Sequence, residues 1–279
     1  MECFEGVEKR IEFVFSPNTT SLRSISPRQL EYVLSFAQCN ILSHRYSNTL
    51  DSYILSESSM FVYDTKIIIK TCGCTNLFNC FKELVKLTNS FNMTYIKYTR
   101  TNFKFPNNQP IPHNAFQNEI FFLDNMFGKG HGKLLNDEHF YVYENLLHSS
   151  CIKGFHLEIC MTDLDTKCLF PYWYDNNNGN SKWCLEQSGI NLLINVWNDD
   201  KNVIIHDHVF HPCGYSINVL HKSRYLTIHV TPQEIHSYAS VEIYSPNKCV
   251  ENTHINIVKM CHQIFNPKQI VIYSDHYKT

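Results

Sequence analysis

The chain has 279 residues, of which 43% are hydrophobic and 18% charged, and its formal net charge is −2. Such a chain can bury enough apolar surface to offset its ordering entropy, which excludes a mainly disordered protein. The near-zero charge excludes a strong basic surface for nucleic acid or for an anionic membrane, and it favours a small, near-neutral ligand.

The N-terminal residues and the cysteines indicate where the protein works. The sequence begins Met-Glu-Cys-Phe-Glu and lacks the basic and apolar regions of a secretion signal. No apolar run approaches the ~18 to 20 residues that a membrane helix needs. We therefore expect a cytoplasmic protein without a membrane span, in which most of the 12 cysteines are reduced core residues.

The first half of the chain contains both strand and helix patterns. Residues Arg10–Ser16 alternate apolar and polar side chains, which predicts a half-buried strand. Ser26 has the type and position of a helix N-cap, because proline follows it and glutamine completes a capping box. Tyr53–Tyr63 and Lys66–Thr71 are predicted strands joined by a tight turn. Leu77–Phe91 is a predicted helix with one apolar stripe.

The second half of the chain is richer in strands. Strands are predicted near Tyr141 and over Phe155–Thr162, Val203–Ile205, Tyr225–Val230, Ser237–Tyr244 and Ile270–Tyr273. The pattern of Thr253–Phe265 predicts a helix, and the asparagine-rich residues 176–180 predict a surface loop. Because strands and helices come in clusters rather than in strict alternation, we expect an α+β fold with antiparallel sheets and helices on their outer faces.

Three short patterns are typical of binding sites in other proteins but fit them poorly here. The glycines of GKGHGK at 128–133 lack the spacing of a phosphate loop and predict a turn. The cysteines of residues 72–80 give CxC without a paired CxxC. His206, His208 and His211 could share a strand face and bind zinc, as in a zinc-binding regulatory protein, but no second cluster accompanies them. We therefore expect no metal site.

Five segments carry the functional signal, and their order and spacing are more specific than any one of them. They are FEGVEK at 4–9, LSESSMFV at 55–62, KTCG at 70–73, FHPCGYS at 210–216 and TIHVTP at 227–232. Together they resemble the motif set of the eukaryotic S-adenosylmethionine decarboxylase family, from about Phe4 to Tyr273. The resemblance implies a single domain over residues 1–279, folded as a four-layer αββα sandwich of two mainly antiparallel sheets with helices on the outer faces.

The same resemblance implies that the chain is a proenzyme that cuts itself between Glu57 and Ser58. The Ser58 hydroxyl would attack the Glu57 carbonyl and turn the peptide bond into an ester. Ser216 would hold the cyclic intermediate, and His229 would remove the Ser58 α-proton. Elimination would then convert Ser58 into a pyruvoyl group, which is the implied cofactor. The products would be two chains that stay associated, a β chain of residues 1–57 and an α chain of residues 58–279.

The implied reaction is decarboxylation of S-adenosylmethionine to the aminopropyl donor for spermidine and spermine biosynthesis. The pyruvoyl carbonyl would form a Schiff base with the substrate amine and act as an electron sink. Cys72 would return a proton to the α-carbon, a task that suits a thiol. Glu5 and Glu8 match carboxylates in or beside the active site, and Phe4 and Phe210 match an aromatic pair around the adenine. The implied substrate-binding residues are Phe4, Glu57, Phe210, Cys213 and Gln233.

The sequence departs from the family pattern in two places. Gln233 stands where the family has a glutamate that binds the ribose hydroxyls, so we expect substrate binding to be weaker by about 1 kcal/mol. A putrescine site of animal-type members is matched in part by Glu12, Lys70, Glu158 and Glu242. Gly154, however, replaces an aspartate there, and Arg10 and Lys97 fall where plant-type members carry basic side chains. We therefore expect the chain to supply its own cations and to depend little on putrescine.

Two alternatives concern partners and activity. The chain ends at Thr279, earlier than family members commonly end, so we expect a sheet edge that is left short or covered by a partner, with a homodimer as one possibility. The main functional alternative is a catalytically silent paralogue that acts as an allosteric partner of an active decarboxylase. Five residues of the implied site are present and argue against this alternative: Glu57, Ser58, Cys72, Ser216 and His229.

Overall fold

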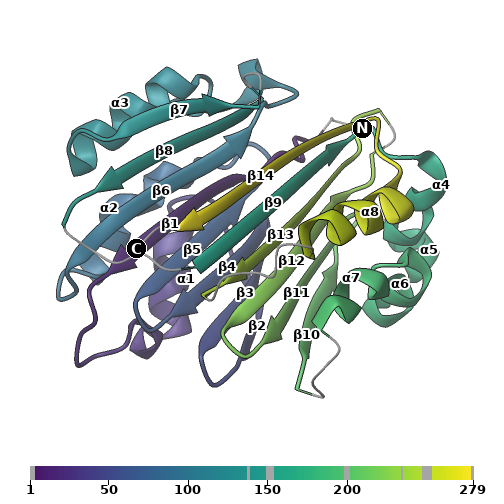
Figure 1. The fold of residues 1–279 in the computed structure, drawn as a ribbon, viewed down its shortest axis with the longest axis horizontal. Helices are drawn as coiled ribbons and strands as arrows, with labels where there is room; N and C mark the ends of the chain where they lie inside the picture. The colour runs from purple at the N-terminus through teal and green to yellow at the C-terminus, as the bar shows by residue number, and fades with distance from the viewer. Residues whose placement is uncertain are drawn as a thin grey trace. The chain divides into compact units, whose positions relative to one another are not determined.

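The computed structural model describes residues 4–136, 139–148, 154–197, 202–233, 235–246 and 253–277. The chain folds as two compact units, one formed by residues 7–151 and the other by residues 1–6 and 152–279. In each unit, helices pack against one face of an antiparallel sheet (Figure 1). The two units are described separately below.

The unit of residues 7–151 is built on an eight-stranded sheet with the order β2-β3-β4-β5-β1-β6-β8-β7. Its strands are β1 (Lys9–Phe15), β2 (Ile41–Tyr46), β3 (Leu50–Leu55), β4 (Ser58–Tyr63), β5 (Lys66–Thr71), β6 (Met93–Thr101), β7 (His131–Leu135) and β8 (Phe140–Leu146). Every neighbouring pair runs antiparallel. Strand β1 therefore lies in the middle of the sheet, between β5 and β6.

Three α-helices cover one face of this sheet. They are α1 (Pro27–Ser35), α2 (Phe81–Leu87) and α3 (Phe116–Phe127), and short 3₁₀ helices η1 (Leu22–Ser24), η2 (Leu77–Cys80) and η3 (Pro106–Asn108) connect them to the strands. Helix α1 begins as the sequence predicts, because Ser26 caps it and a capping box with Gln29 is formed. Its buried residues Leu30 and Leu34 enter a core shared with Ile11 and Phe13 of β1.

The other face of the eight-stranded sheet is polar and is also buried. Along β1, Ile11 and Phe13 point into the helix-covered core, so Arg10 and Glu12 point to the opposite face. Arg10 and Glu12 are both fully buried, as is Lys70 on β5, the register partner of Arg10. Buried charges at this density require ionic partners.

The second unit is built on a six-stranded antiparallel sheet with the order β10-β11-β12-β13-β9-β14. Its strands are β9 (Gly154–Thr162), β10 (Ile204–Val209), β11 (Tyr215–His221), β12 (Arg224–Thr231), β13 (Tyr238–Ser245) and β14 (Gln269–Tyr277). The helices of the unit are α4 (Thr166–Leu169), η4 (Phe170–Tyr172), α5 (Tyr174–Asn177), α6 (Ser181–Ser188), α7 (Asn191–Ile194), η5 (Asn195–Trp197) and α8 (Thr253–Phe265).

This sheet also separates its apolar side chains from its polar ones. Alternate residues of its central strands, such as Ile217, Ile228 and Val241, join a core with side chains of α6, α7 and α8. The residues between them are polar and form two rows across the sheet. One row contains His208, Ser216, His229 and Ser240, and the other contains His206, Asn218, Thr227, Glu242 and Glu158. Most of these side chains are buried.

The structure confirms the predicted α+β class with two antiparallel sheets and helices packed on them. The prediction of one strand over Tyr53–Tyr63 is wrong. The chain instead turns back on itself at Ser56 and Glu57, between β3 and β4, so that Leu55 pairs with Ser58. The predicted helix from Leu77 is shorter than expected, because a 3₁₀ turn precedes α2 and the α-helix ends at Leu87.

Two loop predictions hold only in part. Helix α3 ends at Gly128, which has a φ of 86°, but Gly132 of the GKGHGK segment already lies in strand β7. The predicted loop over residues 176–180 is a loop only after Asn177, where α5 ends. Strand β6 and helix α3 were not predicted from the sequence at all.

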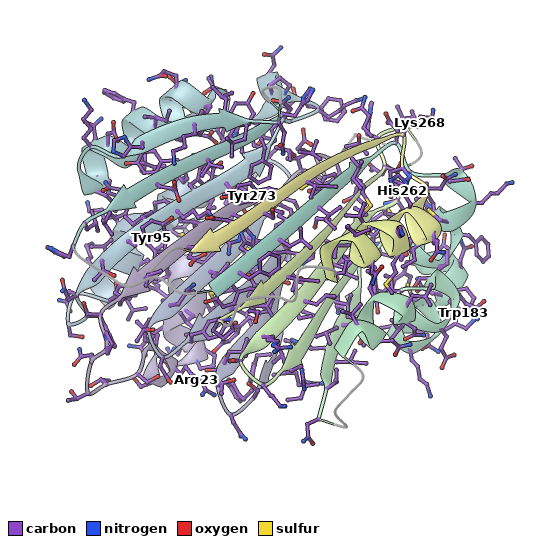
Figure 2. The ribbon with its side chains drawn as sticks, viewed as in Figure 1. Arg23, Tyr95, Trp183, His262, Lys268 and Tyr273 are labelled. Carbon is purple, nitrogen blue, oxygen red and sulfur yellow. The ribbon has the colours of Figure 1, made fainter. Side chains whose placement is uncertain are left out.

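Side-chain anchors hold some loops of the first unit in place. Arg23, labelled in Figure 2, forms an ion pair of 2.7 Å with Asp51 at the start of β3. The same guanidinium donates hydrogen bonds to the carbonyl oxygens of Ser47 and Asn48 in the β2–β3 loop.

Among the helices described, none combines the length and the apolar character of a membrane span.

Candidate functional site

The tight turn between β3 and β4 leads into a residue with a strained backbone. Ser58 has a φ of 137°, which is rare for a residue other than glycine and costs of order 1–3 kcal/mol. The turn is fixed from outside: the Ser56 N–H donates to the Asn40 carbonyl (2.9 Å), and the Asn40 N–H donates to the Ser56 hydroxyl (3.1 Å). The surrounding structure therefore holds the strained backbone in place.

The Glu57 carbonyl, which precedes Ser58, accepts two hydrogen bonds from Cys72. The Cys72 backbone N–H lies 2.9 Å from the carbonyl oxygen, and the Cys72 thiol sulfur lies 3.2 Å from it. Two donors on one carbonyl oxygen polarise the C=O bond and favour negative charge on the oxygen. The arrangement follows from strand register, since Ser58 pairs with Thr71 and the next residues outward are Glu57 and Cys72.

The Ser58 hydroxyl donates a hydrogen bond to Glu8. The distance between Ser58 Oγ and Glu8 Oε1 is 2.5 Å, and the second Glu8 oxygen lies 3.2 Å from the Lys70 ammonium. All three side chains are buried. Short hydrogen bonds of a hydroxyl to a carboxylate are charge-assisted, so Glu8 is well placed to accept the Ser58 proton.

Burial raises the pKa of both acidic groups beside the turn. The pKa of Glu57 rises to about 7 because its carboxyl is largely buried, and Lys9 opposes this rise. Burial, with the neighbouring Glu57 and Glu8 carboxylates, lifts the pKa of the Cys72 thiol well above its usual value, again against Lys9. Cys72 therefore carries its proton at neutral pH, as a proton donor must.

Ser216 and His229 lie in the second unit, on the adjacent strands β11 and β12. They are direct register partners on the polar face of the sheet, and both are buried. His229 Nε2 lies 3.4 Å from the Thr227 hydroxyl oxygen, and that hydroxyl donates to Asn218 Oδ1 at 2.7 Å. Because the Thr227 proton is committed to Asn218, its oxygen can accept a hydrogen bond from Nε2–H, and in that tautomer Nδ1 is the basic nitrogen of His229.

The predicted substrate-binding residues of the second unit lie at strand ends and loops. Phe4 is 37% exposed, which does not fit an ordinary core residue, and its backbone N–H donates to Gln233 Oε1 at 2.8 Å. Phe210 is half-buried, follows β10 and has the ring of His208 4.9 Å away. Cys213 is half-buried nearby in the sequence, and Glu5 is buried. The structure thus brings Phe4 and Gln233 together.

Glu12 is the acidic centre on the polar face of the first unit. Its carboxylate lies 3.0 Å from Arg10 and 2.5 Å from Lys66, and Lys97 is its register partner on β6. Although burial acts to raise the pKa of Glu12, Lys66, Arg10 and Lys97 hold it well below its usual range. The sequence predicted Arg10 and Lys97 as built-in cations and missed Lys66, whose parity with Lys70 on β5 was the available signal.

Glu158 and Glu242 are register partners in the second unit, and His156 lies between them. His156 Nε2 is 3.3 Å from Glu242 Oε1 and 3.8 Å from Glu158 Oε2, and the Tyr225 hydroxyl donates to Glu242. Tyr273 of β14, labelled in Figure 2, packs its ring against His156. Sequence analysis missed His156, although it shares the strand parity of Glu158.

Within the described ranges, one group of side chains has the geometry to hold a metal ion, and it is His156 with Glu158 and Glu242. The histidines of HDHVFH do not form such a group there. His206 is buried, His208 packs on Phe210, and the His211 ring lies 5.2 Å from that of Tyr174. The zinc alternative based on residues 206–211 therefore has no structural support.

Comparisons with known proteins identify the family of the chain. A family model described as adenosylmethionine decarboxylase matches residues 1–277. The S-adenosylmethionine decarboxylase proenzyme of Zea mays is 35% identical over 96% of this chain and 70% of its own length. That of Pisum sativum is 38% identical over 86% of this chain and 71% of its own. Among solved structures, the Trypanosoma brucei AdoMetDC-delta26 monomer matches 76% of this chain and 78% of its own, with a TM-score of 0.57 and 25% identity.

Proposed function

Because the chain belongs to the adenosylmethionine decarboxylase family, we propose that it decarboxylates S-adenosylmethionine after cutting itself at the Glu57–Ser58 bond. The comparisons confirm the family that was predicted from the five sequence segments, and the enzyme is a decarboxylase. Its product is the aminopropyl donor of polyamine synthesis. The proposal of self-cleavage rests on the contacts at the turn between β3 and β4. There the Glu57 carbonyl oxygen accepts two hydrogen bonds from Cys72, and the Ser58 hydroxyl donates a hydrogen bond to Glu8.

Cleavage begins with the Ser58 hydroxyl. As its oxygen attacks the Glu57 carbonyl carbon, its proton passes to the Glu8 carboxylate 2.5 Å away. Lys70 compensates the charge of Glu8 before the transfer. The negative charge that develops on the Glu57 carbonyl oxygen is stabilised by the backbone N–H and the thiol of Cys72.

Backbone strain favours the same step. The proton held by Glu8 passes to the residue 58 nitrogen as the peptide bond breaks and the ester forms. Residue 58 no longer has to hold a φ of 137° once that bond is gone. Strain of order 1–3 kcal/mol would thereby be released, which lowers the free energy of the ester relative to the peptide. A relaxed turn would lack this driving force.

The second stage breaks the ester. His229 takes the α-proton of residue 58, the bond between Cβ and the ester oxygen breaks, and Glu57 leaves as the carboxylate end of the β chain. The dehydroalanine that remains takes up water and releases ammonia, which leaves a pyruvoyl group at the start of the α chain. This stage requires Ser216 and His229 to act on the ester, and their adjacent positions on β11 and β12 support a joint role.

The residues around position 58 suit a carbonyl group of this kind. The group supplies an electron sink for the electron pair that departing carbon dioxide leaves behind. Cys72 holds a proton for the substrate α-carbon, because burial keeps its thiol protonated. Phe4 and Phe210 offer ring faces to the adenine, with Gln233 for the ribose hydroxyls. Glu5 and Cys213 are the other residues of the second unit that the family pattern assigns to the substrate or to the reaction.

Mass spectrometry of the denatured protein tests the proposal directly. Active protein should show two masses, residues 1–57 and residues 58–279 with a pyruvoyl start, and a carbonyl reagent should label the second. Ser58→Ala should give one intact chain, whereas Ser59→Ala, a matched change at the next hydroxyl, should still be cut. Cys72→Ala keeps the backbone N–H donor and loses the thiol donor, so it should still be cut, more slowly, but should lose decarboxylation. An intact, unlabelled chain would overturn self-cleavage and is what the silent paralogue predicts.

A further inference from the structure

Lys9 is a buried cation that none of the steps above uses. It lies at the start of β1 and is fully buried. Its ammonium donates to the Gly73 carbonyl at 2.9 Å and to the Gln109 side-chain oxygen at 3.0 Å, and it lies 5.3 Å from the ring centre of Phe103. A buried ammonium costs several kcal/mol unless its surroundings compensate it, so its position calls for a reason.

These contacts tie Lys9 to the turn that carries Cys72. Gly73 follows Cys72 directly and has a φ of 63°, a conformation that favours glycine. The Gly73 carbonyl accepts from Lys9 and also from the Gln109 amide at 3.2 Å. Two donors on one carbonyl, both from elements distant in sequence, fix the direction in which the chain leaves β5. They therefore fix the position of the Cys72 thiol.

The charge of Lys9 also matters for Cys72. The Glu57 carboxylate lies 4.0 Å from the Cys72 sulfur, and Glu57 and Glu8 both disfavour the ionised thiol, while Lys9 opposes them. The proposed reaction asks Cys72 to give up its proton and become a thiolate. A thiolate beside two carboxylates in a buried site needs a positive charge close by.

We propose that Lys9 is a positioning residue for Cys72, which holds the Cys72–Gly73 turn through the Gly73 carbonyl and supplies the positive charge beside the thiol. The role of Cys72 as proton donor rests on the proposed function, but the effect of Lys9 on the Cys72 thiol does not. Loss of Lys9 should make Cys72 a poorer acid. During turnover, slower protonation of the correct carbon should allow more misplaced protonation and faster self-inactivation.

Thiol alkylation in uncut protein tests the effect of Lys9 without any need for activity. In a Ser58→Ala background, iodoacetamide labelling of Cys72 is followed by peptide mass spectrometry from pH 7 to 10, and Cys74 in the same peptide is the internal reference. An opposite charge nearby shifts a pKa by about one unit or more, so Lys9→Met should slow Cys72 labelling about tenfold at each pH, with Cys74 unchanged. Lys9→Arg should restore most of the rate.

Two further variants separate charge from folding. Lys133→Met removes an exposed lysine of the edge strand β7 and should leave both labelling rates unchanged. Gln109→Leu keeps the Lys9 charge and removes one anchor of the turn, so it should change the Cys72 rate in the same direction by a smaller factor. Circular dichroism shows whether each variant is folded. If Lys9→Met does not fold, Gln109→Leu and Lys9→Arg provide the test.

The outcomes of the two proposals are distinguishable. Equal Cys72 labelling rates in the parent, in Lys9→Met and in Gln109→Leu would overturn the role of Lys9, even if the enzyme cuts itself normally. A chain that is never cut would overturn the proposed function and leave the labelling result standing. In cut protein, Lys9→Met should complete fewer turnovers before inactivation at an unchanged KM, and Lys9→Arg should recover them.

Discussion

The carboxyl group of Glu57 should make the stability of the uncut chain depend on pH. Burial raises its pKa from the usual 4.5 to about 7 in the folded protein. The folded chain therefore binds this proton more tightly than the unfolded chain does. Its contribution to the free energy of unfolding is fully present below pH 4.5 and is lost as the pH rises through about 7. A shift of this size corresponds to about 3 kcal/mol.

Urea unfolding of a Ser58→Ala chain at pH 5 and pH 8 measures this contribution, because the chain stays in one piece. Adding Glu57→Gln should leave the midpoint at pH 5 nearly unchanged and raise the free energy of unfolding at pH 8 by up to about 3 kcal/mol. Other titrating groups cancel in the comparison of the two variants. Glu31→Gln, at an exposed position on α1, is the matched control and should have no such effect. An equal change at both pH values would refute the reasoning.

Three further predictions concern processing and binding. Glu8→Gln replaces a charge-assisted acceptor of the Ser58 hydroxyl by a neutral one, so self-cleavage should slow about fivefold or more in a time course of the two chains; an unchanged half-time would exclude Glu8 as proton acceptor. Gln233→Glu should lower the KM for S-adenosylmethionine about fivefold at constant kcat, and a constant KM would contradict a ribose contact. Putrescine should change cleavage and turnover less than about twofold, because Glu12 already has Lys66 beside it; stimulation of several-fold would show that the internal cations do not replace the diamine.

The alternation of residue types predicted the strands but not the burial of their polar faces. Arg10–Ser16 reads as a half-buried strand, yet both faces of β1 are buried. Alternation of apolar and polar residues along a strand predicts which side chains lie on the same face of the sheet. It does not predict whether the polar face is covered by other parts of the protein. The polar face of β1 is buried because Glu12 has Arg10 and Lys66 within ion-pair distance, and such pairing depends on neighbouring strands.

Two buried side chains without a counterpart in the family pattern, Lys66 and His156, were the part of the site that sequence reasoning missed. The resemblance to the family assigned Glu12, Glu158 and Glu242 to an acidic site, and in the structure each of them lies on the polar face of its own sheet. Lys66 and His156 were found only in the structure, because no family position pointed to them. Both follow from parity: each shares a strand face with a residue already singled out, and a buried carboxylate attracts such a neighbour.

The turn at Ser56 and Glu57 could not be predicted because its only local turn signal is serine, which favours turns weakly. The segment LSESS has no glycine, proline or asparagine, and the residues on either side favour strands. The turn is made by Asn40 and Cys72, which bind its backbone from other elements. The register that pairs Ser58 with Thr71 also sets Cys72 against the Glu57 carbonyl, so a slip of one residue between β4 and β5 would remove both donors at once. The pairing of β4 with β5 therefore also prepares the bond for attack, and variants that loosen this pairing should lose cleavage before they lose the fold.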